Sequence, residues 1–339
     1  MQEVHEAEQA QQAQQAQQAQ QAQRSTPLID VKVVALGGGH GLAASLSALR
    51  HVVSDLTAVV TVADNGGSSG RLRREFGVLP PGDLRQALAA LCGDDEWGRT
   101  WARVLQHRFS SDGAMDEHAV GNLLIVALWE LLGEHVDALD WVGRLLGAQG
   151  RVLPMSVSPI DITASVRGID PDDPSALSTV RGQVEVASTS GQVVSIALEP
   201  NDPPACPEAA AALTAADWVI LGPGSWFTSV IPHLLVPDLR KALISSQARK
   251  VVTLNLEPQT GETDGFSPDT HLDVLGDHAP DLRLDVVLAD RKSVVDVDLL
   301  RATAASFGAE LVLADVSADD GSPRHDPIKL ANVYAGIMG

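Results

Sequence analysis

The chain has 339 residues, which suffices for one large α/β domain or for two domains of about 150 residues. Apolar residues make up 45% of it but aromatic residues only 4%, so Val, Leu and Ala must fill the core, as they do in a parallel sheet covered by helices. The formal net charge of −20 and the lack of a Lys/Arg stripe argue against a nucleic-acid-binding protein.

The cysteines and the apolar segments exclude further classes. Cys92 and Cys206 lie far apart with no CxxC motif around them, so neither a zinc site nor a disulfide framework is expected. No apolar run reaches the roughly 18 residues of a membrane helix, and no secretory signal is recognisable. We therefore expect a cytoplasmic protein without membrane insertion.

Residues 1–26 are rich in Gln and Ala, with QQA recurring from Gln11 to Gln23. Such a segment has almost nothing to bury, so we expect a disordered extension. Residues 27–339 are expected to form a single α/β domain.

The first predicted strand, Val31–Leu36, ends in a glycine loop that leads into a helix with Leu42, Leu46 and Leu49 on one side. Glycines let backbone N–H groups approach a phosphate, and the helix N-terminus favours an anion there. The third position of the dinucleotide fingerprint is Leu42, so the motif is incomplete, and a tight turn without a ligand is the alternative. The candidate ligand residues of this loop are Gly37, Gly38, Gly39, His40 and Gly41.

The second predicted strand, Leu56–Val62, is followed by an unusually polar loop. An acid that suits a ribose hydroxyl or a divalent ion stands beside glycines that suit an anion nest, with arginines behind them. The alternative is a polar surface loop. The candidates here are Asp64, Asn65, Gly66, Gly67, Ser68, Ser69 and Arg73.

Two helix starts add candidates, each with a structural alternative. Asp83 is expected to cap the helix Leu84–Leu91, and Arg85 either faces a phosphate or lies on the surface. Asn122, at the head of the helix Leu123–Leu132, is either an N-cap or a reader of a base or sugar.

The sequence pattern of residues 150–200 predicts a β-rich insert. Three segments resemble strands: Val152–Val157, Gln183–Ala187 and Val193–Leu198. The last two flank the turn residues Ser188–Gly191 and are expected to form a hairpin.

The α/β alternation then resumes, with strands expected at Trp218–Leu221, Val251–Leu256, Leu284–Leu288 and Glu310–Leu313. Helices are expected at Ala209–Ala216, at Val236–Ser245 and from Asp326 onward. This alternation predicts a Rossmann-like, three-layer, doubly wound and mostly parallel sheet.

Polar and glycine clusters follow several of these strands, and the carboxyl ends of parallel strands meet at one edge, where ligands bind. Gly222, Gly224, Ser225 and Thr228 offer a second phosphate-type loop, for which a structural turn with core aromatics is the alternative. Asn255 closes a further strand. We expect these residues to meet the first two loops.

No pattern of a catalytic or metal centre appears. The histidines are scattered without HExxH spacing, and neither a GxSxG elbow nor a Walker A motif is present. We therefore assign no catalytic and no metal residue.

Five ordered motifs together resemble one family: Gly37–Leu42, Thr61–Arg73, Pro81–Arg85, His118–Leu124 and Leu221–Ser225. The likeness extends through Asn255–Thr263 and Arg324–Leu330. The chain resembles the YvcK-like gluconeogenesis factors, relatives of the 2-phospho-L-lactate transferases.

This resemblance implies a protein that binds UDP-N-acetylglucosamine or a similar UDP-sugar and needs no cofactor. It implies a regulator of cell shape and peptidoglycan supply on gluconeogenic carbon rather than a proven enzyme. A homodimer and an unidentified protein partner are also expected from it.

Two departures from the family pattern affect the alternatives. Asn65 stands where the family commonly has a second acid, which weakens an Mg²⁺-dependent transfer of a phospho-organic acid, the second hypothesis. Asn255–Thr263 also departs from the usual run. A nicotinamide oxidoreductase in which Asp64 reads the ribose is the third hypothesis, and Leu42 counts against it.

Overall fold

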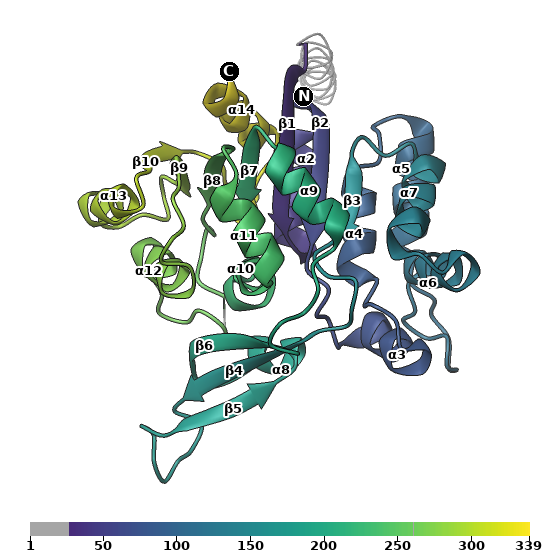
Figure 1. Ribbon diagram of the computed structural model, residues 1–339, viewed down its shortest axis with the longest axis horizontal. Helices are drawn as coiled ribbons and strands as arrows, with labels where there is room; N and C mark the ends of the chain where they lie inside the picture. Colours follow the sequence, from purple (N-terminus) through teal and green to yellow (C-terminus); the bar gives the residue numbers. More distant parts are fainter. Residues whose placement is uncertain (1–26, 260) are drawn as a thin grey trace, which may run out of the picture.

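The computed structural model describes residues 27–259 and 261–339, so the Gln/Ala-rich segment lies outside the described residues. Its main element is a seven-stranded parallel sheet of order β10-β9-β8-β7-β1-β2-β3 (Figure 1). The strands are β1 (Ile29–Gly37), β2 (Val53–Val60), β3 (Arg151–Pro154), β7 (Trp218–Leu221), β8 (Arg249–Thr253), β9 (Val286–Asp290) and β10 (Glu310–Ala314).

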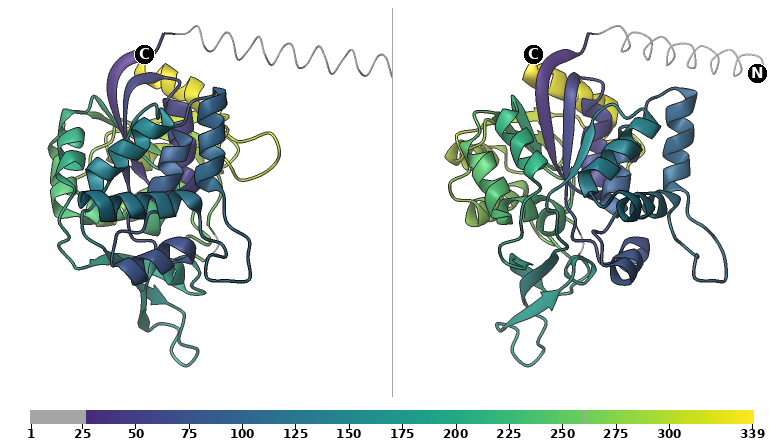
Figure 2. Two further views of the ribbon diagram at one scale, coloured as in Figure 1. Left: turned by 90° about the vertical axis from the view of Figure 1, so that its right-hand side faces the viewer. Right: turned by 45° about the vertical axis from the view of Figure 1, so that its right-hand side comes forward.

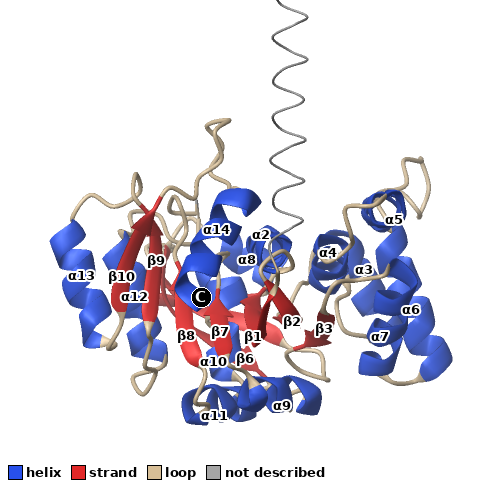
Figure 3. Ribbon diagram, turned by 90° about the horizontal axis from the view of Figure 1, so that it is seen from above, coloured by secondary structure: helices blue, strands red, loops and turns tan. Residues whose placement is uncertain are grey.

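Helices cover both faces of the sheet, as Figure 3 shows from above. The helices α2 (Gly39–Leu49), α4 (Gly82–Ala90) and α14 (Pro327–Met338) lie on one face, and α9 (Pro207–Ala215) and α11 (Pro237–Ser245) lie on the other. The other helices are α3 (Gly67–Phe76), α5 (Glu96–Gln106), α6 (Val120–Leu132), α7 (His135–Leu146), α10 (Pro232–Leu235), α12 (Pro268–His278) and α13 (Val297–Ser306), with a π-helix at Trp226–Val230. The predicted doubly wound α/β fold is therefore confirmed.

The central strands form because their aliphatic residues are buried from both sides. In β1, Val33 to Leu36 are at most 2% exposed, and β7 is buried along its whole length. A continuous aliphatic run is typical of a parallel strand between two helical layers. The chain order reverses between β1 and β7, and this reversal is the point where open α/β sheets bind ligands.

A small antiparallel sheet interrupts the alternation, in the order β5-β4-β6. Its elements are β4 (Asp161–Arg167), β5 (Leu177–Arg181), α8 (Gln183–Ala187) and β6 (Gln192–Glu199). Figures 1 and 2 show this insert, with α3 beside it, below the carboxyl ends of β1 and β2. The predicted β-rich insert is thus confirmed.

The strand assignments inside the insert need correction. Gln183–Ala187 is a short helix and not a strand, because Gly182 (φ 105°) turns the chain and Asn65 Oδ1 accepts a hydrogen bond from Val184 N at 3.1 Å. The predicted hairpin is therefore wrong, and β4 lies between β5 and β6. Strand β3 also belongs to the main sheet, where it pairs with β2.

The two ends of the insert leave the sheet side by side. Ser156 and Ala205 form an isolated β-bridge, and Cys206 N donates to Met155 O at 3.2 Å. We call these four residues the neck of the insert.

Candidate functional site

The first glycine loop lies at the reversal between β1 and β7. Gly39 has a φ of 55°, in the left-handed region that favours glycine. An added Cβ at Gly41 would lie 2.3 Å from Pro223 O, so this loop and the loop after β7 pack backbone to backbone. The predicted convergence of these two loops is therefore what the fold produces.

A cavity of about 610 Å³ opens beside these loops. Of the predicted residues, His40, Gly41, Gly224 and Asn255 line it. The cavity is completed by residues that sequence reasoning did not select: Ala43, Ala44, Ser47, Pro223, Leu256, Glu257, Pro258, Gln259, Pro323, Arg324 and His325.

Asn255 has a positioning role in this wall. Its Oδ1 accepts from Gly224 N and its Nδ2 donates to Gly224 O, both at 2.9 Å. The side-chain amide of Asn255 therefore bonds to both backbone polar groups of Gly224, and it fixes the loop after β7 beside the cavity.

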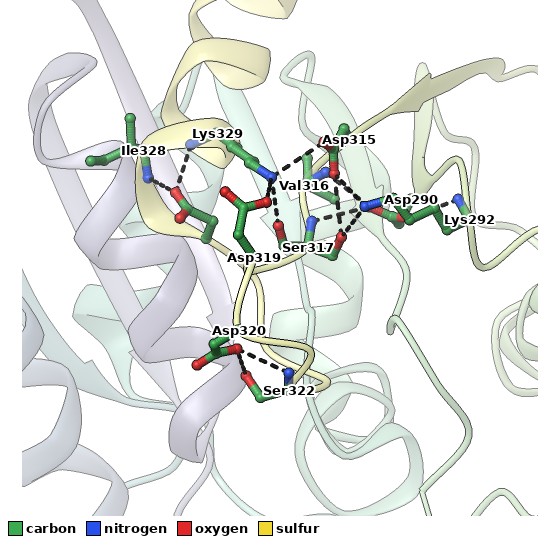
Figure 4. A network of polar contacts seen from close by, with 11 residues as sticks. Asp290, Lys292, Asp315, Val316, Ser317, Asp319, Asp320, Ser322, Ile328 and Lys329 are labelled. Carbon is green, nitrogen blue, oxygen red and sulfur yellow. Dashed lines mark hydrogen bonds and ion pairs between the residues drawn. The ribbon is translucent and has the colours of Figure 1, made fainter. Parts of the chain in front are cut away.

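The far wall is a loop, residues 317–325, which is closed by a bridge between Ser317 and His325. Figure 4 shows how it is tethered: Lys329 Nζ on α14 donates to Asp319 at 2.6 Å, to Ser317 O at 3.0 Å and to Asp315 at 3.2 Å. Buried Asp290 accepts from the backbone N–H groups of Val316 and Ser317 at the start of the loop. These contacts hold His325 at the cavity, where burial lowers its pKa to about 4 and keeps it neutral.

Asp83 lies against the other end of the first glycine loop. A Cβ added at Gly38 would be 2.5 Å from its Oδ2, and Gly39 N–H bonds to its carboxylate. Burial, followed by the nearby charge of Asp64, raises the pKa of Asp83 to about 7. Asp83 was expected to be an N-cap, which is wrong: Pro81 is the N-cap of α4, and the Asp83 carboxylate bonds across to the loop.

Arg85 and Asn122 belong to a buried chain of hydrogen bonds. Arg85 Nε donates to Asn122 Oδ1 at 2.8 Å, Asn122 Nδ2 donates to Ser68 Oγ at 3.1 Å, and Ser68 Oγ lies 3.0 Å from His118 Nδ1. The surface alternative for Arg85 is wrong, since it is 3% exposed. Asn122 lies inside the first turn of α6, whose N-cap is Ala119.

The second polar segment is a helix start and not a loop, since α3 begins at Gly67. Asn65 and Arg73 attach it to the insert: Asn65 Nδ2 donates to Glu185 at 2.7 Å, and Arg73 pairs with Asp161 at 2.6 Å. A Cβ at Gly66 would meet Val184 at 2.6 Å. These residues therefore fasten the insert.

Ser69 and Asp64 stay near Asp83, around Gly82. A Cβ added at Gly82 would lie 2.3 Å from Ser69 Oγ and 3.3 Å from Asp64 Oδ2. Asp64 and Asp83 thus form a carboxylate pair next to the first glycine loop. Among the described residues, no group of three or more His, Cys, Asp or Glu has metal-binding geometry.

The residues after Gly222 have mostly structural roles. Thr228 is 1% exposed within the π-helix, and its N–H donates to buried Glu262 at 2.8 Å. Ser225 accepts from Gln259 Nε2 at 3.2 Å. Burial raises the pKa of Glu262, whose carboxylate bonds to backbone N–H groups in the first part of the π-helix. Gln259 and Glu262 therefore hold the segment that follows Asn255 against Ser225 and the π-helix.

The fold and the site together define a Rossmann-like α/β protein with a cavity at the reversal point of its parallel sheet. A family model described as 2-phospho-L-lactate transferase CofD matches residues 33–325. The chain belongs to this family.

Particular relatives within the family narrow the class. A "Putative gluconeogenesis factor" of Mycobacterium tuberculosis is 52% identical over 308 residues, which covers 90% of each chain. A "Gluconeogenesis factor" of Listeria innocua is 33% identical and covers 91% of this chain and 95% of its own. A crystal structure of a UPF0052 family protein from Bacillus halodurans superposes with a TM-score of 0.80 at 31% identity, covering 91% of this chain and 99% of its own. The predicted resemblance to the gluconeogenesis factors is confirmed.

Among the described residues, no helix is long and apolar enough to cross a membrane.

Proposed function

We propose that this protein binds a UDP-sugar, UDP-N-acetylglucosamine above all, in the 610 Å³ cavity and acts as a cytoplasmic regulator. In this proposal the protein regulates cell shape and peptidoglycan supply during growth on gluconeogenic carbon. The proposal needs no cofactor and includes a homodimer and a protein partner that receives the signal.

The observation that carries the proposal is the composition of the cavity. Its volume lies within the range of about 300–1,000 Å³ that small-molecule sites occupy. On one side the first turn of α2 offers the backbone N–H groups of His40 and Gly41, and on the other side Arg324, which pairs with Asp320 at 2.7 Å, offers a guanidinium; a diphosphate needs this combination. The naming of the relatives as gluconeogenesis factors supports the link to growth on gluconeogenic carbon.

The lining also favours binding over turnover. Glu257 is the one carboxylate among the lining residues, and His40 and His325 are not part of any Ser/His or Cys/His pair there. A nucleophile with an activating base, which covalent catalysis requires, is therefore not supplied by this lining.

The test is isothermal titration of the full chain with UDP-N-acetylglucosamine, with and without Mg²⁺, and with GDP and NAD as controls. We expect saturable binding that is selective for the UDP-sugar and independent of the metal. Ala44→Leu on α2 places an isobutyl group in the cavity and should abolish binding. The matched control is Ala302→Leu at an exposed position of α13, which should bind as the wild type does.

Two results would refute the proposal: titration without saturation, or equal binding by wild type and Ala44→Leu. A titration without saturation would exclude the UDP-sugar as a ligand. Equal binding by Ala44→Leu would exclude the cavity as the binding site.

A second candidate is an Mg²⁺-dependent phospho-organic-acid transferase, and the Asp64–Asp83 pair favours it. Two carboxylates beside a phosphate-type loop suit Mg²⁺, which binds through one or two carboxylates and substrate phosphates. When bound, the ion would neutralise charge that develops on a transferred phosphoryl group. Asn65 has an amide side chain, which bonds to Glu185, so it adds no third acid to the pair. Binding of GDP that depends on Mg²⁺ and disappears in Asp64→Asn would support this candidate.

A further inference from the structure

We infer that the protein has a second ligand site, cationic and built to hold a phosphate group, formed by Arg85 and His118 with Arg71 and Arg108 beside them. None of these four residues lines the 610 Å³ cavity. The inference goes beyond the proposed function, because it adds a separate ligand, a phosphomonoester or inorganic phosphate, to the UDP-sugar.

Arg85 is the centre of this site. Its side chain is 3% exposed, and its stem is held against Gly121, where an added Cβ would lie 2.8 Å from Cγ and Cδ. Its Nε is occupied by Asn122. The two Nη groups bond to no described residue, yet they are not among the side-chain atoms sealed from solvent. A fixed guanidinium fork with free donors is suited to an anion.

His118 supplies a further donor, and its tautomer follows from its partner. Ser68 Oγ already accepts from Asn122 Nδ2 and from Ala119 N, so its single hydrogen points to His118 Nδ1 at 3.0 Å. Burial and then Arg71 lower the pKa of His118, which keeps the ring neutral. The proton therefore sits on Nε2, which has no partner among the described residues and is not sealed from solvent.

Arg71 and Arg108 concentrate positive charge in a protein whose net charge is −20. Both donate to backbone carbonyls, Arg71 to Asp116 O at 2.5 Å and Arg108 to Glu117 O at 2.7 Å. In residues 27–259 and 261–339, neither forms an ion pair with a carboxylate. Their charges remain available to a ligand.

The charge of Arg108 acts on buried Arg85. Burial and then Arg108 lower the pKa of Arg85 to about 10, although Asp83 and Asp64 act in the opposite direction. A phosphate dianion would offset the repulsion between Arg108 and Arg85, and its tetrahedral oxygens are suited to accept from a guanidinium fork and from an imidazole N–H.

The experiment is calorimetric titration of the full chain with inorganic phosphate and with glycerol phosphate, using glycerol as the uncharged control. We expect saturable binding of the phosphates and none of glycerol. A preference for glycerol phosphate identifies an organic phosphomonoester as the ligand, and equal affinity identifies phosphate itself. Arg85→Lys keeps the charge but loses the fork, so the affinity should fall about tenfold.

Arg108→Ala provides a second variant, since Arg108 is exposed and its loss spares the core. It should weaken phosphate binding about threefold and leave UDP-N-acetylglucosamine binding unchanged. Arg301→Ala on α13, at the other end of the sheet, is the matched control and should change neither affinity.

Two outcomes would overturn the second site: phosphate that does not saturate, or phosphate that competes with UDP-N-acetylglucosamine and is unaffected by Arg108→Ala. A protein that binds phosphate but no UDP-sugar would refute the proposed function and leave this inference standing.

Discussion

Tyr334 is the only tyrosine of the chain and is fully buried at the junction of four elements. Its hydroxyl lies 2.9 Å from Thr253 Oγ1 and 3.1 Å from Ser45 Oγ, and Ser45 donates to Gly222 O at 3.0 Å. Since Ser45 uses its hydrogen on Gly222, Tyr334 donates to Ser45 and accepts from Thr253. This chain of bonds joins α14, β8 and α2 to the loop after β7.

Tyr334→Phe removes two of these bonds and leaves the buried Thr253 hydroxyl without an acceptor. An unsatisfied buried donor costs about 1–3 kcal/mol, so we expect a loss of about 2 kcal/mol, or ~3 °C in Tm for a domain of this size. Burial also raises the pKa of Tyr334 from 10 to about 12. The fold thus favours the neutral phenol, whose contribution is complete below pH 10 and is lost as the pH rises through 12. Over this window the loss is about 3 kcal/mol.

Two measurements check this expectation. Urea unfolding across the alkaline range should show a fall in the free energy of unfolding that Tyr334→Phe does not show. Ultraviolet absorbance of the tyrosinate reports one residue only, so its midpoint in the native protein can be read directly. A native midpoint near pH 10, or a variant as stable as the wild type at neutral pH, would refute the reasoning.

Three further predictions concern the site. Asp83→Asn should remove the loss of stability that the raised pKa imposes as the pH rises from 3.8 through 7, so its Tm should exceed that of the wild type in mildly alkaline buffer; a parallel pH dependence would contradict this. Asn65→Asp places a carboxylate against Glu185 and should speed amide hydrogen exchange in α8, and unchanged exchange would exclude this role of Asn65. Lys329→Met should release the loop 317–325 and weaken UDP-sugar binding several-fold with little change in Tm, whereas wild-type affinity would show that the tether is dispensable.

The sequence predicts the parallel sheet well because its strands are buried on both sides. β1 contains the continuous aliphatic run Val33–Leu36 and β7 is buried along its whole length, and the expected bounds of β7, Trp218–Leu221, agree with the structure. The meeting of the two glycine loops follows from the rule for carboxyl ends of parallel strands. Local pattern and fold agree in this part of the chain.

The prediction fails where distant residues decide the local structure. Val184 and Val186 alternate as in a strand, but Asn65, 119 residues earlier than Val184, bonds the backbone of a helix there. Asp83 has the local pattern of a cap, and only the tertiary fold places it under Gly39.

The residues of the cavity wall likewise could not be predicted from local sequence pattern. Arg324 and His325 lie in an irregular loop, and their place in the cavity wall depends on Lys329 of α14 and on buried Asp290 of β9. In the sequence their signal was the segment Arg324–Leu330, which carried a family likeness but no periodic pattern.

The neck of the insert has a consequence for how such proteins diversify. Because Ser156 and Ala205 lie side by side, the polypeptide between them starts and finishes at one point of the scaffold. That stretch can lengthen, shorten or be exchanged in evolution while the strand register and the cavity stay intact. The insert is therefore joined to the main sheet at one place, so a change in its length need not alter the strand register of that sheet.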